Sequence, residues 1–127
     1  MLICLVAGLL VAPLGDEVTL RWTHSIEKVI WEEDYRLEAQ ALRLVEARVR
    51  GTGAGMEPPA GAVQKDGAWH YVPTLPLLPR IELRHSPYVP PYILCNASGC
   101  QPASAWLPKL EENAVLELVP CQAQRFK

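Results

Sequence analysis

Alternation of apolar and polar residues between Val18 and Glu38 constrains the fold of this chain more than any other feature. In residues 18–26, apolar side chains and His24 occupy every second position, and Thr, Arg and Ser fill the positions between them. A period of two is the signature of a half-buried β-strand. A second alternating run, residues 29–38, follows closely, and the two runs together predict an antiparallel hairpin.

The second run places one charged residue, Glu33, on the same face as Trp31. If residues 27–28 form a two-residue turn, Trp22 lies opposite Glu33. The same register puts His24 opposite Trp31 and diagonally next to Glu33. A longer connection that kept the face assignment would still point both polar side chains inward. We therefore expect a hydrogen-bonded pair between His24 and Glu33 in the core.

Twelve prolines, spread from Pro13 to Pro120, divide the rest of the chain into short segments rich in Val, Leu, Trp and Tyr. This composition suits many short strands better than long helices. With 127 residues, the chain has the length of one domain. We predict that residues 1–127 form a single all-β domain, a small sandwich or flattened barrel of about seven to nine mostly antiparallel strands.

Two segments leave alternatives open. Residues 2–14 carry no charge and are too short to span a membrane as a helix, although they have the length of a signal-peptide core. No Lys or Arg precedes them and no A-x-A follows, so we favour a buried first strand over a signal remnant, with no strong membrane anchor. Residues 36–50 have the composition of a helix, yet their alternation slips phase once, as at a β-bulge, and we favour strands.

The glycine-rich segment 51–59 has the spacing G-x-G-x-G, which invites comparison with a phosphate-binding loop. Such a loop opens into a helix N-terminus, and Pro58 and Pro59 prevent a helix there. We expect a turn in which several glycines adopt positive φ.

Charge and motifs exclude several classes of partner. The net charge is −2 and the acids and bases are interspersed, so the chain lacks the basic footprint of a nucleic-acid or anionic-membrane binder. We expect no nucleic-acid partner. No motif indicates a cofactor, and we expect none.

Four cysteines allow three disulfide connectivities. Cys95 and Cys100 flank a short polar turn, and Cys4 and Cys121 lie in the expected first and last strands. We predict the pairs Cys95–Cys100 and Cys4–Cys121. Structural disulfides persist in oxidising compartments, so this arrangement favours an extracytoplasmic location, the periplasm or cell envelope. Four free thiols in a cytoplasmic protein are the alternative.

The segments LRWTHSIEKVIWEEDYRL, LVEARVRGTGAGMEPP, DGAWHYVP, YILCNASGC and LVPC resemble a small bacterial family of unknown function. Genes of this family commonly lie beside tripartite ATP-independent periplasmic (TRAP) transporters of the TAXI class. The resemblance implies a context, a cell-envelope accessory of solute uptake that contacts the transporter permease or its solute-binding protein. The residues that match the family motifs are Trp22, His24, Ser25, Glu27, Trp31, Glu32, Gly53, Gly55 and Met56.

Catalytic and metal-binding interpretations have less support from the residues. His24 and Ser25 are neighbours in a strand, so their side chains point to opposite faces and form a poor proton relay. A metal site built from His24, Glu33, His70 and His85 lacks the close ligand spacing that such sites show.

We therefore favour a non-catalytic accessory protein that acts by protein binding or assembly. The alternative is a small-ligand-binding β-barrel whose interior is lined by Trp22, Trp31, His24 and Glu33. A hydrolase or a metal-site protein comes third.

Overall fold

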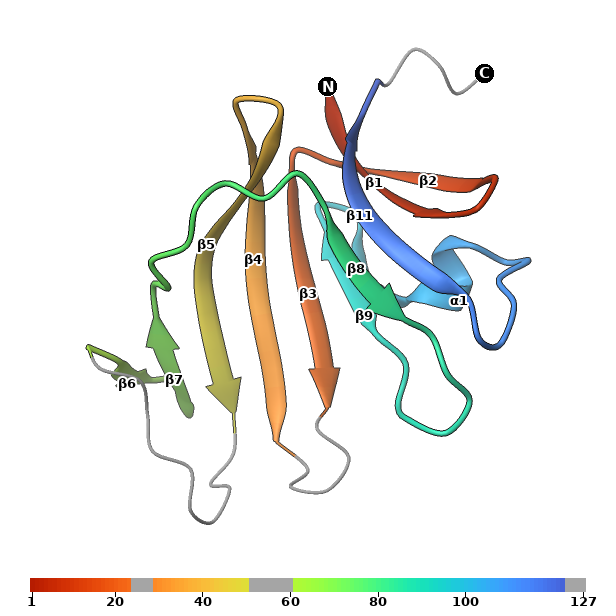
Figure 1. Ribbon diagram of the computed structural model, residues 1–127. Coiled ribbons are helices and arrows are strands. Elements are labelled where there is room, and N and C mark those ends of the chain that lie inside the picture. Colours follow the sequence, from red (N-terminus) through yellow and green to blue (C-terminus); the bar gives the residue numbers. More distant parts are fainter. Residues whose placement is uncertain (24–28, 51–60, 123–127) are drawn as a thin grey trace.

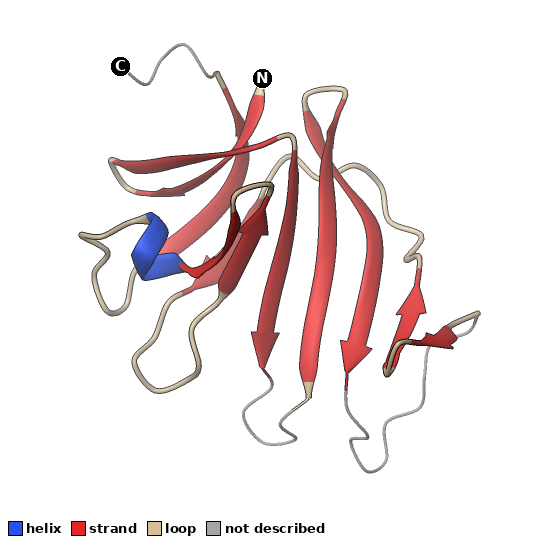
Figure 2. Cartoon of the chain, turned by 180° about the vertical axis from the view of Figure 1, so that it is seen from behind, coloured by secondary structure: helices blue, strands red, loops and turns tan. Residues whose placement is uncertain are grey.

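The computed structural model describes residues 1–23, 29–50 and 61–122, and the chain forms two β-sheets (Figures 1 and 2). One sheet contains β1 (Leu2–Ala7), β2 (Leu10–Gly15), β8 (Ile81–Arg84) and β11 (Val115–Cys121). The other contains β3 (Glu17–Thr23), β4 (Ile30–Glu38), β5 (Ala41–Arg50), β6 (Val63–Lys65), β7 (Ala68–Tyr71), β9 (Ile93–Asn96) and β10 (Gly99–Pro102). A short helix, α1 (Ala103–Trp106), follows β10. Within the described ranges, no helix has the length and apolar character needed to cross a membrane.

The strand order is β2-β1-β11-β8 in the four-stranded sheet and β10-β9-β3-β4-β5-β7-β6 in the seven-stranded sheet. Every strand pairing is antiparallel. The all-β sandwich is thus confirmed, and the sheets do not close into a barrel. The described residues form eleven strands rather than seven to nine. One reason is that residues 2–14 fold as a hairpin of two strands instead of a single strand.

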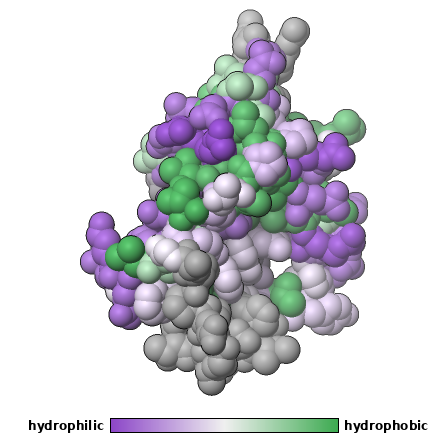
Figure 3. All heavy atoms as spheres, turned by 60° about the vertical axis from the view of Figure 1, so that its left-hand side comes forward, coloured by the Kyte–Doolittle hydropathy of each residue, from purple (hydrophilic) through white to green (hydrophobic). Residues whose placement is uncertain are grey.

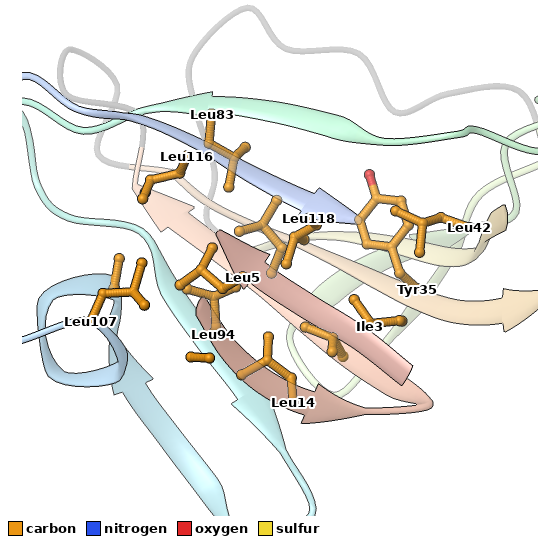
Figure 4. Packing of buried hydrophobic residues seen from close by; sticks show 14 of the residues in the cluster. Ile3, Leu5, Leu14, Tyr35, Leu42, Leu83, Leu94, Leu107, Leu116 and Leu118 are labelled. Atoms are coloured by element: carbon orange, nitrogen blue, oxygen red, sulfur yellow. The ribbon is translucent and has the colours of Figure 1, made fainter. Parts of the chain in front are cut away.

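The hydrophobic core lies between the four-stranded sheet and one end of the seven-stranded sheet. Figure 4 shows side chains of β1 and β11 facing side chains of β4, β5 and β9. The core includes Ile3, Leu5, Leu116 and Leu118 on one side and Leu20, Tyr35, Leu42 and Leu94 on the other. Hydrophobic residues also reach the surface, where they gather in the upper half of the view in Figure 3, between hydrophilic margins.

The segment 36–50 is strand, as predicted, and not helix. Residues 39–40 form the turn between β4 and β5 with φ of 50° and 62°, the geometry of a type I′ hairpin turn. Opposite β4, the pairing skips Val45 between Leu44 and Glu46. The predicted phase slip is therefore a β-bulge, and it lets hydrophobic residues on both sides of it face the core.

The hairpin of β3 and β4 has a different register from the one predicted. Trp22 lies opposite Trp31, and Leu20 rather than Trp22 lies opposite Glu33. The prediction was wrong because it centred the hairpin on residues 27–28, whereas the observed pairs have their centre one residue earlier in the chain. The face assignment is unchanged, since Trp22, Trp31 and Glu33 share one face. His24 lies outside the described residues.

Both predicted disulfides are present. Cys4 and Cys121 join β1 to β11, which are paired neighbours in the four-stranded sheet. Cys95 and Cys100 lie directly opposite each other in the hairpin of β9 and β10. The first and last strands of the chain are thus both hydrogen-bonded and covalently linked.

We expect the disulfide between Cys4 and Cys121 to stabilise the fold more than the one between Cys95 and Cys100. The sequence separations are 117 and 5 residues. Loop-closure entropy then gives about 5 kcal/mol for the long loop and about 2 kcal/mol for the short one. Replacing each pair with alanine and measuring the free energy of unfolding in guanidinium tests this. A larger loss for the short loop would contradict the expectation.

Candidate binding site

Adjacent glutamates of β4 project to opposite faces of the seven-stranded sheet. Glu33 shares its face with Leu20 and Ala47, to which it is paired on the neighbouring strands. This face continues from the core, and we call it the inner face. Glu32 is paired with Arg21 and Arg48 on the outer face. The two carboxylates therefore have entirely different surroundings.

Three arginines surround Glu32, the one charged residue among the described ranges that is buried, with 4% of its surface exposed. Its carboxylate accepts hydrogen bonds from Nε of Arg50 at 2.7 Å, Arg21 at 2.9 Å and Arg48 at 3.3 Å. Burial alone would raise the pKa of Glu32, but these bonds outweigh burial and lower it. Glu32 is consequently ionised, and both of its carboxylate oxygens accept hydrogen bonds from arginines.

The outer-face network continues from Arg48 and reaches one more strand, β7. The Arg48 guanidinium donates to Asp34 at 2.6 and 2.7 Å and to Glu46 at 2.9 Å. Oε1 of Glu46 lies 2.8 Å from Nδ1 of His70 on β7. The bond with His70 and then the bond with Arg48 lower the pKa of Glu46. These charges neutralise one another, and we assign the network a structural role in joining β3, β4, β5 and β7.

Aromatic side chains dominate the inner face beyond the core. Trp22, Trp31, Val49 and Trp69 form one row across β3, β4, β5 and β7. The rings of Trp22 and Trp31 are stacked, with centroids 6.2 Å apart and planes 9° from parallel. The ring of Tyr92 lies against the ring of Trp22, with centroids 6.3 Å apart.

The next row of the inner face places Glu33 among these rings, with Tyr71 in the same row on β7. We call the whole set the aromatic face. It comprises Trp22, Trp31, Trp69, Tyr71 and Tyr92 around Glu33, and all six side chains are partly exposed.

Glu33 is a half-buried carboxylate without a counter-ion in the described part of the chain. Tyr35 Oη donates to its Oε1 at 2.9 Å. Burial raises the pKa of Glu33 despite this bond. Burial, and then the negative charge of Glu33, raise the pKa values of Tyr71 and Tyr92 as well.

The structure brings together three of the predicted site residues, Trp22, Trp31 and Glu33, and turns Glu32 away from them. The bond that Glu33 makes here is to Tyr35, and its pairing with His24 stays a prediction. The remaining predicted positions lie outside the described residues: His24, Ser25, Glu27, Gly53, Gly55 and Met56.

Three members of the aromatic face were not among the predicted site residues. Trp69 and Tyr71 alternate along residues 68–72, and this pattern indicates a shared face but not which strand lies beside it. Tyr92 precedes β9 and gives no periodic signal.

The residues considered for a metal site do not come together where the structure describes them. His70 is on the outer face, bonded to Glu46, whereas Glu33 is on the inner face. His85 follows β8 in the other sheet. Across residues 1–23, 29–50 and 61–122, no cluster of three or more His, Cys, Asp or Glu side chains has the arrangement of a metal site.

An open hollow of about 470 Å³ lies on another part of the molecule. Asp16, Glu17 and Asp34 supply its acidic groups, and Arg36 is the one cation in its lining. Asp34 is already engaged by Arg48 and by Oγ1 of Thr19. The hollow therefore offers fewer unpaired groups than its composition suggests.

A family model described as Domain of unknown function (DUF1850) matches residues 18–102. No curated protein and no solved structure matches the chain significantly. The matched range contains almost all of the seven-stranded sheet and every residue of the aromatic face, while β1, β2 and β11 lie outside it.

Replacing Glu32 with glutamine should cost roughly 1–3 kcal/mol of unfolding free energy, because it removes the buried charge that accepts hydrogen bonds from three partly exposed arginines. Glu38→Gln is the matched control. Glu38 also pairs with an arginine, Arg43, but at an exposed position, so its loss should be far smaller. Chemical denaturation measures both variants. Equal losses would show that burial of Glu32 adds nothing to its pairing.

Replacing Glu33 with glutamine should change the free energy of unfolding in the opposite direction. A raised pKa in the folded state means that ionised Glu33 destabilises the fold, so Glu33→Gln should be as stable as the natural chain or more stable at pH 7. This advantage should shrink as the pH falls through the raised pKa and disappear below the unfolded value of about 4.3. Unfolding curves recorded from pH 4 to pH 8 test it, and a variant destabilised at pH 7 would contradict it.

Proposed function

Since this chain belongs to the DUF1850 family of domains of unknown function, we propose a function from its own residues and their arrangement. The proposed function is that of a non-catalytic accessory to a TRAP-type solute uptake system, acting outside the cytoplasm by binding. The aromatic face is the observation that carries the proposal.

The cysteines support the location. All four form disulfides, one within a hairpin and one between β1 and β11. Such bonds are rare in reducing compartments and common in periplasmic and secreted domains. This favours the periplasm or another part of the cell envelope.

The aromatic face supports binding. Trp and Tyr are the residues that most often anchor interfaces, because they bury a large area with few rotatable bonds. Here Trp22, Trp31, Trp69 and Tyr71 are partly exposed on paired strands, so the positions of these four side chains are set before any partner arrives. A rigid, partly apolar surface of this kind suits recognition.

The family-motif segments leave the sheet at the same end as the aromatic face. Thr23, which precedes residues 24–28, is paired with Ile30, and Ile30 is paired with Arg50, which precedes residues 51–60. Trp22 and Trp31 are the next pair inward. The motif residues that the resemblance identified are therefore joined to this one end of the sheet.

Two kinds of partner fit this role. The first is a protein, the transporter permease or its solute-binding protein. The second is a small ligand, and Glu33 is the observation that favours it. Small-molecule sites typically combine an aromatic lining with one or a few buried polar groups that fix orientation.

The accessory role predicts that Trp31→Leu weakens binding to the transporter proteins by at least about 30-fold, as loss of an aromatic anchor does. Leu9→Ser is the control, since Leu9 is a fully exposed hydrophobic residue on the β1–β2 turn. Co-purification with the permease and with the solute-binding protein, followed by solute uptake in cells that carry the operon, gives the readout. Equal binding and uptake by both folded variants would reject the aromatic face as the contact.

A further inference from the structure

The two neighbouring glutamates of β4 differ in one respect that bears on ligand binding. Glu32 is held by three arginines, whereas Glu33 has Tyr35 as its hydrogen-bond donor and no ion pair within the described ranges. A half-buried carboxylate without a counter-ion is costly in the free protein. A cation that reached Glu33 would remove that cost.

The rings around Glu33 are also suited to a cation. The faces of tryptophan and tyrosine carry negative electrostatic potential and attract ammonium groups placed within about 6 Å of the ring centre. Trp22 stacks on Trp31 and contacts Tyr92, and Trp31 lies two residues from Glu33 on the same face of β4. Aromatic rings and one carboxylate together form the recognition chemistry of organic ammonium ions, whose methyl or methylene groups need apolar contact and whose charge needs a counter-ion.

We propose that the aromatic face binds a small organic cation, a quaternary or protonated amine, with its charged group beside Glu33 and its carbon atoms against Trp22 and Trp31. This inference rests on the proposed function in treating the aromatic face as a binding surface. An anionic solute is disfavoured at the same place because Glu33 would repel it. Metal ions are a poor match, because one carboxylate supplies too few ligands.

Choline and its neutral carbon analogue 3,3-dimethyl-1-butanol (dimethylbutanol) provide a direct test. They have the same shape and differ in whether a charged nitrogen or a neutral carbon carries the three methyl groups. Titration followed by tryptophan fluorescence and calorimetry should show choline binding at least about tenfold more tightly than dimethylbutanol. Glu33→Gln should lower choline affinity at least about tenfold and leave dimethylbutanol unchanged. Choline binding should also weaken as the pH falls and Glu33 takes up a proton.

Two further variants separate loss of the site from loss of the fold. Trp31→Leu should weaken both probes, because both need the ring surface. Glu38→Gln removes an exposed carboxylate outside the aromatic face and should leave choline affinity unchanged. All variants are checked for a complete unfolding transition before titration.

Equal affinities for the two probes, unchanged choline affinity in folded Glu33→Gln, or the absence of saturable choline binding would each overturn the inference. None of these results bears on the complex with transporter proteins. A preserved complex without choline binding rejects the cation site and leaves the accessory role in place. Choline binding without a complex supports the cation site and rejects the protein contact.

Discussion

The alternation of side chains along β4 is the constraint on which both faces of the seven-stranded sheet depend. Because Glu32 and Glu33 are adjacent, they cannot share a face, and each has only the surroundings that its own face supplies. The outer face supplies arginines from β3 and β5. The inner face supplies hydrophobic contact and the hydroxyl of Tyr35. The ion-pair network thus fixes the pairing of the strands, and that pairing holds the aromatic rings in one row.

Local patterns in the sequence account for much of the fold. Alternation identified the hairpin faces and the slip at Val45, and the positions of the cysteines identified both disulfides. Other features have no local signal. Ile3, Cys4 and Leu5 are all fully buried, so the strand shows no alternation, and the hairpin in residues 2–14 is hidden. The Ala-Gln turn at 39–40 also lacks the glycine or asparagine that usually marks its type.

The sequence predicted only those residues of the candidate site that lie within one hairpin, β3 and β4. Trp22, Trp31 and Glu33 were placed on one face by their spacing alone. Trp69 joins them through the pairing of β5 with β7, and Tyr92 joins through a ring contact made before β9 begins. Two of the three arginine partners of Glu32 likewise come from β5, at a distance that periodicity within one strand does not encode. Long-range pairing, rather than residue type, is what the chain's local patterns leave undetermined.

The pairing of β1 with β11 gives the chain a required order of assembly. A polypeptide emerges from its N-terminus, so β1 is made first and waits for its partner until residues 115–121 appear. The hairpins of β4 with β5 and β9 with β10 are local and can form earlier. Until β11 arrives, Cys4 is a free thiol in the presence of Cys95 and Cys100. If Cys4 pairs with Cys95 or Cys100 before Cys121 is available, thiol exchange is the reaction that restores the native pairs.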